Sequence, residues 1–329
     1  MRKLASIQRI KELENIENAD AIEKAYVLGW QLVVKKGEFK VGDLCVYCEI
    51  DCLMPERPEF EFLKPRKMRI RTVKLRGQIS QGICFPLSIL PTGIEIKEGL
   101  DVTELLEITK YEAPIPACLE GKVKGRIPSF IPKTDETRVQ ILQDLLDEFQ
   151  GTKCYITEKL DGSSATYFIK DQQFGVCSRN LELIESEENS FWKVARELDI
   201  KNKLLSLNGN YAIQGELVGE GIQKNTLKLR GQTVFFYNLF DIDNHRYVKY
   251  SEFIDRINFM KLSTVPIVND DYILRNDINE LVELSVGKSL INKNGWREGI
   301  VIRSLEEKFF KSDRLSFKAV NPRFLLKYD

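Results

Sequence analysis

A short segment at residues 157–164, TEKLDGSS, combines a lysine, an acid and a glycine in a way that suits phosphate chemistry. Lys159, Asp161 and Gly162 follow one strand-like run and precede another, SATYFI. A lysine that attacks phosphorus must be deprotonated, and because its ordinary pKa is ~10.4, the protein must supply roughly 4 kcal/mol of differential stabilisation at neutral pH. Positive neighbours or a metal ion would supply it. The segment therefore marks Lys159 as a candidate nucleophile.

Further charged and aromatic residues follow Lys159 in a fixed order. They lie in the segments VCSRN, AIQGELVGEGIQKN, FFYNLFDI, GWREGIVIRS and RLSFKAVN, which bring Arg179, Asn180, Glu216, Phe240, Glu298 and Lys318. This order resembles the six short motifs of the covalent nucleotidyltransferases, the superfamily of ATP ligases and mRNA capping enzymes. In that superfamily the motifs lie on strands that line a nucleotide cleft.

Several segments are similar to ATP-dependent RNA ligases rather than to capping enzymes. GELVGEGIQKN and FDI look like ligases that act on RNA ends paired in a duplex. ENADAIEKAYVLGW with KLRGQISQG resembles the oligonucleotide-binding (OB) barrel of tRNA-binding modules. A barrel placed before the catalytic domain and joined to it by a proline-rich connector is similar to one branch of these RNA ligases.

The resemblance implies a role for each residue near the nucleotide. Lys159 would attack the α-phosphorus of ATP and release pyrophosphate, which divides one difficult step into easier ones. Phe240 would stack on adenine, with an ordinary core position as the alternative. Thr157 and Glu158 would border the base pocket.

Two cations and an amide would contact the nucleotide beyond the base. Arg179 and Lys318 would hold phosphate oxygens, where charge develops, and Asn180 lies beside Arg179. A surface cation is the alternative for both. Many ligases have a second lysine two residues after the one at the position of Lys318, and here Val320 stands there. Lys311 and Lys327 are candidates for the missing charge.

Three acidic residues of the motifs point to a divalent cation. Asp161, Glu216 and Glu298 would repel bound phosphates unless cations intervene, and Mg²⁺ or Mn²⁺ held largely through its own water shell resolves the conflict. Such a cation would also lower the pKa of the lysine. Glu216 is the strongest candidate among them for a ribose hydroxyl contact.

The elements that must position these residues form two domains. Residues 1–110 show short alternating runs with glycine punctuation, as expected for a small OB-like β-barrel. Residues 134–329 mix strands joined by short turns with helices, so we expect an α+β nucleotidyltransferase domain of ATP-grasp-like antiparallel sheets with flanking helices. Residues 111–133 carry four prolines and form the expected linker. After it, Leu142, Leu145, Leu146 and Phe149 predict a helix that is capped by Thr134 or Asp135 and stopped by Gly151.

A run of cations in the barrel is the candidate nucleic-acid contact. Between Phe62 and Thr92 there is no acidic residue. Arg69, Arg71, Lys74 and Arg76 lie in this stretch, where the apolar phase slips between Thr72 and Val73 and indicates a bulge or bend. The alternative is a solvated edge strand that charge protects from aggregation.

Composition excludes several classes of protein. The 43% hydrophobic residues are too many for a disordered chain, and the 49 basic residues balance the 49 acidic ones, so nucleic-acid binding requires a local patch. No apolar run is long enough for a bilayer, and we expect a cytoplasmic or nuclear protein with reduced thiols. Cys45, Cys48 and Cys52 lack a nearby fourth zinc ligand, and His245 reads as a turn residue.

The sequence therefore predicts an ATP-dependent RNA ligase that acts as a monomer and forms a lysyl-AMP and then a 5′-adenylated polynucleotide. The resemblance implies sealing of nicks in duplexes, with RNA on the 3′-hydroxyl side. Two alternatives stay open. A capping guanylyltransferase would share the lysine chemistry but use GTP, and a non-catalytic RNA-binding protein would use the barrel alone.

Overall fold

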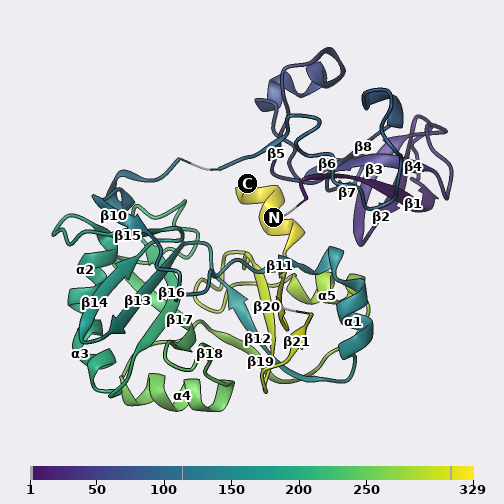
Figure 1. Ribbon diagram of the computed structural model, residues 1–329. Helices are drawn as coiled ribbons and strands as arrows, with labels where there is room; N and C mark the ends of the chain where they lie inside the picture. Colours follow the sequence, from purple (N-terminus) through teal and green to yellow (C-terminus); the bar gives the residue numbers. More distant parts are fainter. Residues whose placement is uncertain (1–2, 113, 312) are drawn as a thin grey trace. The chain divides into compact units, whose positions relative to one another are not determined.

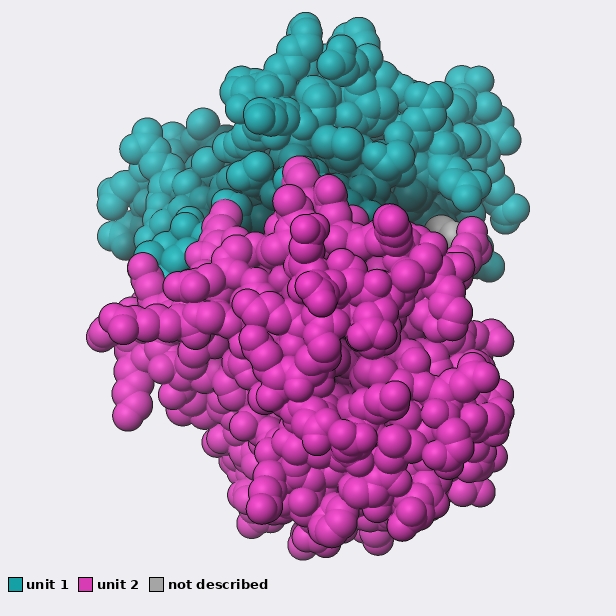
Figure 2. Space-filling view, turned by 90° about the vertical axis from the view of Figure 1, so that its left-hand side faces the viewer, with its two compact units in different colours: residues 1–113, 325–329 teal, residues 114–324 magenta. Residues whose placement is uncertain are grey.

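The computed structural model describes residues 3–112, 114–311 and 313–329. The chain divides into two compact units, one of residues 1–113 with 325–329 and the other of residues 114–324 (Figure 2). The second unit begins within the proline-rich stretch, and both of its ends lead into the first unit. No helix in the described ranges is both long enough and apolar enough to cross a membrane.

Five antiparallel strands of the first unit curl into a nearly closed barrel, in the order β3-β2-β1-β4-β8. They are β1 (Ala5–Asn15), β2 (Ile22–Val27), β3 (Trp30–Lys35), β4 (Leu44–Cys48) and β8 (Ile83–Phe85) (Figure 1). The N–H of Gln81 donates to the carbonyl of Gln31 at 2.9 Å, which ties β3 to the segment before β8. Ile7, Trp30 and Tyr47 are fully buried inside, because alternate residues of each strand point inward. The predicted barrel is confirmed.

Short elements complete the first unit. They are the paired strands β5 (Cys52–Leu53) and β9 (Thr109–Lys110), the hairpin of β6 (Val73–Leu75) and β7 (Gln78–Ser80), and the 3-10 helices η1 (Pro58–Arg66) and η2 (Leu87–Ile89). The hairpin starts directly after the predicted slip between Thr72 and Val73. Cys45, Cys48 and Cys52 are free thiols in the barrel core.

Two sheets form the frame of the second unit. The seven-stranded sheet contains, in order, β10 (Val123–Arg126), β15 (Leu181–Leu183), β14 (Gln173–Cys177), β13 (Ser163–Lys170), β16 (Tyr211–Gly219), β17 (Gln232–Asp241) and β18 (Arg246–Tyr247). The five-stranded sheet contains β11 (Thr137–Arg138), β23 (Ser316–Val320), β20 (Gly299–Ser304), β12 (Lys153–Lys159) and β19 (Ile267–Ile273). All neighbours are antiparallel except β11 and β23. The predicted α+β class is confirmed.

Helices cover these sheets through their apolar faces. On the seven-stranded sheet lie α2 (Ser190–Glu197), α3 (Ile200–Leu205) and α4 (Tyr250–Phe259), and on the five-stranded sheet lie α1 (Gln143–Phe149) and α5 (Ile278–Ser285) (Figure 1). The Asn189 side chain caps α2 by accepting from the N–H groups of Phe191 and Trp192. The remaining elements are η3 (Ala117–Leu119), η4 (Val139–Ile141), the hairpin of β21 (Phe309–Phe310) and β22 (Asp313–Arg314), and α6 (Pro322–Tyr328).

The helix predicted from Thr134 or Asp135 onward is wrong at its start. Only Gln143–Phe149 is helical. The preceding residues form β11 and η4, because Thr137 and Arg138 pair with β23 and the ladder of a buried sheet outweighs local helix propensity. The cap expected from Thr134 or Asp135 is therefore absent, and both residues line a cavity instead.

Candidate active site

A cavity of about 290 Å³ lies in the second unit, lined by residues of both sheets and of the segment before β11. Strand β12 of the five-stranded sheet ends here, and the turn after it leads into β13 of the seven-stranded sheet. The chain thus crosses from one sheet to the other at TEKLDGSS. The predicted motif residues that line the cavity are Thr157, Glu158, Lys159, Arg179, Glu216 and Lys318.

Lys159 is the last residue of β12 and is paired in register with Gly299 of β20. This pairing places Glu298 beside it, and the Lys159 Nζ donates to Glu298 Oε1 at 2.6 Å. Gly162 stands in the turn because a Cβ there would lie 2.4 Å from the carbonyl oxygen of Leu217 on β16. The close approach of two backbones, rather than an unusual φ, requires the glycine.

The acids around Lys159 act on its charge in the direction opposite to the one the chemistry needs. Burial lowers the pKa of Lys159, but Glu298, Glu216 and Asp161 outweigh burial and raise that pKa above its ordinary value. Burial raises the pKa of Asp161 to about 6 and that of Glu216 to about 8. Without a cation the amine is therefore protonated, so the lowered pKa that we expect depends on the bound cation.

Lys318 shows the opposite behaviour. It lies on β23, and burial, with Lys159 and Arg138 as the next contributors, lowers its pKa to about 7. Arg138 stands opposite it in the parallel ladder of β11 and β23. Burial and the neighbouring cations destabilise the protonated form of Lys318, and a bound anion would stabilise it. The position therefore suits a phosphate group.

The carboxylates fit a hydrated metal ion better than a directly bound one. No group of three or more His, Cys, Asp or Glu side chains in the described residues is arranged to hold a metal ion directly. The Oε2 atom of Glu298 is buried and finds no hydrogen-bond partner in the described part of the protein. An acceptor of this kind suits a donor such as a metal-bound water.

The aromatic residue that lines the cavity is Tyr237, whereas Phe240, which the sequence interpretation placed against adenine, does not line it. Phe240 is 3% exposed and packs in a core cluster, with its ring 5.3 Å from that of His245 and 5.1 Å from that of Tyr247. Tyr237 lines the cavity. It occupies a bulge of β17, where Phe236 and Asn238 oppose consecutive residues of β16. The alternation of buried and half-buried residues along β17 continues to Tyr237 and is lost at the bulge, so Asn238, Leu239 and Phe240 are all buried.

Two further polar residues of β12 fix the wall beside Tyr237. Glu158 is 1% exposed and its Oε2 accepts from the N–H of Leu290 at 2.7 Å. Burial raises the pKa of Glu158 above its ordinary value, although hydrogen bonds from Ser289 and Leu290 oppose that change. The Thr157 hydroxyl accepts from Arg303 at 3.5 Å.

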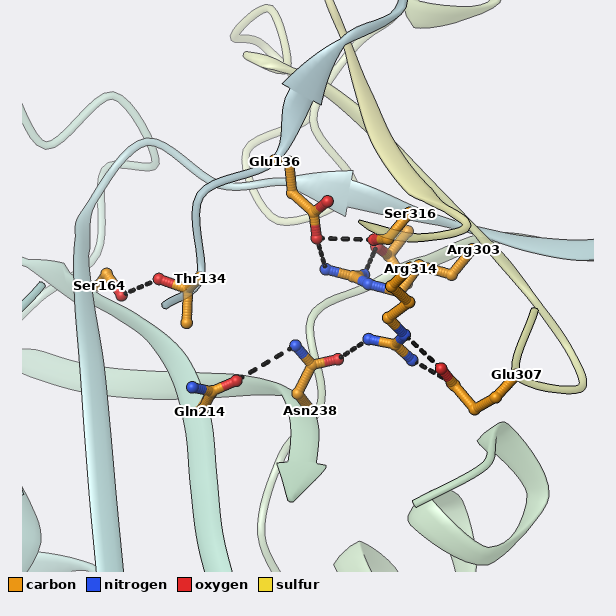
Figure 3. Close-up of polar contacts among 10 residues, drawn as sticks. Thr134, Glu136, Ser164, Gln214, Asn238, Arg303, Glu307, Arg314 and Ser316 are labelled. Atoms are coloured by element: carbon orange, nitrogen blue, oxygen red, sulfur yellow. Dashed lines mark hydrogen bonds and ion pairs between the residues drawn. The ribbon is translucent and has the colours of Figure 1, made fainter. Parts of the chain in front are cut away.

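Arg303, which the sequence interpretation missed, lies on β20 with 2% exposure and lines the cavity. Its Nη2 donates to Glu136 Oε1 at 3.0 Å, and Ser316 donates to the same oxygen at 2.7 Å (Figure 3). The guanidinium carbon is 5.4 Å from the centre of the Tyr237 ring. Glu136 precedes β11, so the segment after the linker helps to orient a cavity cation. The sequence signal that could have identified Arg303 was a single charged residue within the apolar run GIVIRS.

A second chain of polar contacts links the seven-stranded sheet to the β21–β22 hairpin. Arg314 pairs with Glu307 and donates to Asn238 Oδ1 at 2.9 Å, and Asn238 donates to Gln214 Oε1 at 3.3 Å (Figure 3). Gln214 in turn donates to the carbonyl of Pro132 at 2.8 Å. The chain therefore links β16 and β17 to the segment that carries Thr134, Asp135 and Glu136.

The remaining motif residues on this side differ in placement. Arg179 lines the cavity and its Nη2 lies 2.5 Å from Asp135 Oδ1, with both side chains about half exposed. Asn180 is exposed in the turn before β15 and does not line the cavity. Val320 is 4% exposed, and Lys311 lies in the β21–β22 hairpin with its ammonium 5.0 Å from the Phe310 ring centre. The cations that line the cavity are Lys159, Arg179, Arg303 and Lys318.

In the first unit, the structure divides the predicted cationic run. Arg69 is 7% exposed, and its Nη2 lies 2.6 Å from both Asp51 Oδ1 and Asp329 Oδ1. Its guanidinium carbon is 3.9 Å from the centre of the Tyr111 ring. Arg69 is thus held by internal contacts and does not belong to an exposed ridge. Arg71 is half-buried, whereas Lys74 and Arg76 are exposed on the β6–β7 hairpin.

Comparison with known proteins agrees with this architecture. One family model, described as an OB-fold domain, matches residues 4–87, and another, described as RNA ligase, matches residues 152–320. A search of the curated proteins gave no match.

Solved structures of Naegleria gruberi RNA ligase match nearly the whole chain. One with pyrophosphate is 41% identical, covers 99% of this chain and 98% of the other, and gives a TM-score of 0.91. A mutant with ATP and Mn is 40% identical, with 98% of each chain covered and a TM-score of 0.92. Another mutant, with AMP and Mn, is 40% identical, with 98% of each chain covered and a TM-score of 0.91. With an OB-type barrel followed by a nucleotidyltransferase domain, and with likeness of this extent, the chain belongs to the RNA ligase family.

Proposed function

We propose that this chain is an ATP-dependent RNA ligase that seals nicks in duplexes through a lysyl-AMP and a 5′-adenylated RNA, with RNA on the 3′-hydroxyl side. The observation that carries the proposal is the Lys159 amine, ion-paired to Glu298 in a cavity that also contains Lys318 and Arg179. The relatives bind ATP or AMP with Mn, according to the descriptions of their structures.

In the first step, the Lys159 Nζ attacks the α-phosphorus of ATP, a P–N bond forms, and pyrophosphate leaves with the electrons of the broken P–O bond. Arg179 and Lys318 contact phosphate oxygens as their charge increases. Because burial lowers the pKa of Lys318 to about 7, the phosphates of ATP would stabilise its protonated form as an ion pair inside the cavity.

Before the attack, the Lys159 amine must lose its proton. Asp161, Glu216 and Glu298 would hold a divalent cation through its waters, and this cation would offset the acids that raise the Lys159 pKa. Tyr237 would stack on adenine, and Glu216 would accept from a ribose hydroxyl.

In the later steps, AMP passes from Lys159 to the 5′-phosphate of RNA, and a 3′-hydroxyl then attacks that phosphate while AMP leaves. Lys74 and Arg76 would contact the RNA backbone, since phosphate contacts position a strand without specifying its sequence. One polypeptide supplies every residue of this scheme, so we propose that a monomer suffices.

The test is intact mass after incubation with ATP and Mg²⁺ or Mn²⁺. The wild type should gain the mass of one AMP and Lys159→Ala should not, whereas Lys201→Ala, which removes an exposed lysine of α3, should label normally. Equal labelling of Lys159→Ala would overturn the assignment, and labelling by GTP alone would favour a capping guanylyltransferase. RNA binding without any label would favour a non-catalytic RNA-binding protein.

The nick itself is tested by comparing end-labelled substrates. Nicked duplexes with RNA on the 3′-hydroxyl strand should be sealed faster than all-DNA nicks or separate single strands. Equal rates on single strands would contradict a nick-specific ligase while leaving the lysyl-AMP chemistry intact.

A further inference from the structure

One loop of the second unit is internally hydrogen-bonded, positively charged and outside the cavity. Residues 287–296, GKSLINKNGW, join α5 to the strand that follows Glu298 and contain two lysines and no acid. Lys288 and Trp296 form an antiparallel bridge that closes the loop. The N–H of Ser289 donates to the Gly295 carbonyl at 3.1 Å, and the Lys288 ammonium donates to the Asn294 carbonyl at 3.2 Å.

The loop is anchored to the active site from two sides. The N–H of Leu290 donates to Glu158, whose side chain lies against the cavity. The Asn292 side chain donates to the carbonyl of Thr226 at 2.9 Å, and the Thr226 hydroxyl donates to Asp161 Oδ2 at 3.2 Å. The loop is therefore connected by hydrogen bonds to Glu158 and, through Thr226, to Asp161, which flank Lys159 in the sequence.

Two cationic side chains make cation–π contacts with the Trp296 ring. The Lys288 ammonium is 4.3 Å from the ring centre and the Arg323 guanidinium carbon is 5.2 Å from it. Trp296 itself is half-buried, and both cations are exposed and long enough to move. Trp30 is 0% and Trp192 8% exposed, so Trp296 is the one tryptophan of the chain that is not buried.

We propose that Trp296, Lys288 and Arg323 form an RNA-docking platform beside the active site, in which Trp296 stacks on a base and the two cations contact phosphates. The inference rests on the proposed function, because it takes RNA as the substrate. Nonspecific binding of nucleic acid strands combines aromatic stacking with cations in this way. Stacking of a base is stronger than a cation–π contact at an exposed site, so a base replaces a cation on the ring and frees it for a phosphate.

The platform has a spectroscopic readout of its own. Adding nicked RNA to the protein should quench or shift the emission of Trp296, while the buried Trp30 and Trp192 remain silent. Trp296→Phe should abolish the RNA-dependent signal. An unchanged emission spectrum in the presence of RNA that the enzyme seals would overturn the proposal.

Binding measurements test the same contacts independently. Trp296→Leu should weaken RNA binding by about tenfold, and Trp296→Phe, which keeps a ring, by less. Lys288→Ala with Arg323→Ala should reduce the slope of log Kd against log salt by about 0.7 to 0.9 for each cation removed. Lys201→Ala with Lys203→Ala, on α3, is the matched control and should leave the slope unchanged.

Self-adenylation with ATP separates the two hypotheses, because it needs no RNA. A wild type that never acquires AMP would refute the proposed function. A wild type that acquires AMP and seals RNA, with variants of the platform that bind RNA as tightly as it does, would refute the platform alone. If Trp296→Leu fails to fold, the double cation variant gives the same decision.

Discussion

Replacing Tyr237 and Phe240 in turn would decide which aromatic residue supports adenine. Tyr237 lines the cavity, whereas Phe240 packs among core residues and contacts His245 and Tyr247. We therefore expect Tyr237→Leu to impair ATP binding and Phe240→Leu to impair folding stability.

The magnitudes follow from what each ring contacts. Loss of base stacking is worth about 1–3 kcal/mol, so Tyr237→Leu should raise the KM for ATP by about 5- to 150-fold. Tyr237→Phe removes only a hydroxyl that bonds Ser164 and Thr134. The Ser164 and Thr134 hydroxyls also bond each other at 2.7 Å and so keep a partner. Tyr237→Phe should therefore lower the free energy of unfolding by only about 0.5–1.5 kcal/mol.

Self-adenylation rates at varied ATP concentration give KM, and thermal unfolding gives stability. Phe240→Leu should lower the free energy of unfolding by about 1–2 kcal/mol and leave KM near the wild-type value. An increase in KM for Phe240→Leu together with an unchanged KM for Tyr237→Leu would refute the placement of the base. Tyr237→Phe is the internal control, because it keeps the ring.

Three further perturbations test the site and the barrel. Burial lowers the pKa of Lys318 to about 7, so folding below that pH buries an ammonium, which destabilises the folded protein. Lys318→Met should therefore raise Tm by several degrees at pH 7. This gain in Tm should vanish as the pH approaches ~10.4, the pKa of lysine in the unfolded chain. Gly162→Ala places a Cβ 2.4 Å from a β16 carbonyl oxygen, so it should lower the free energy of unfolding by about 1–3 kcal/mol and slow self-adenylation. Gly125→Ala, with open space around the added Cβ, should change neither the unfolding free energy nor the self-adenylation rate. Lys74→Ala with Arg76→Ala should reduce the salt slope of RNA binding by about 1.4–1.8, and an unchanged slope would remove the hairpin from the RNA interface.

The order of the motifs predicted the strands that carry the chemistry, because each motif residue is adjacent to a run whose alternation is unambiguous. Lys159, Glu216 and Lys318 lie on or at the end of such strands and reach the cavity. The bounds of the helices were harder to predict. The residues expected to begin the helix that ends at Phe149 include Thr137 and Arg138, which pair with β23 instead.

The missed residues depend on features that alternation cannot express. The alternation along β17 is lost between Tyr237 and Phe240, at a bulge, and a bulge depends on the partner strand as much as on its own sequence. Arg303 is held by Glu136 from a distant segment, so its direction is a tertiary property. Arg69 looked like a surface cation because its partners, Asp51 and Asp329, are far apart in the sequence.

The catalytic unit has the connectivity of an insertion in the barrel unit, and the pairing of Arg69 with Asp329 lies within the barrel unit. The catalytic unit leaves the barrel unit at residue 113 and returns to it at residue 325, so it is tethered at two points. Removal of residues 325–329 would leave a buried guanidinium with one carboxylate fewer, which is costly. Dissection into an isolated barrel should therefore retain this peptide, supplied through a linker or as a separate fragment, or the excised barrel will be less stable than the intact enzyme.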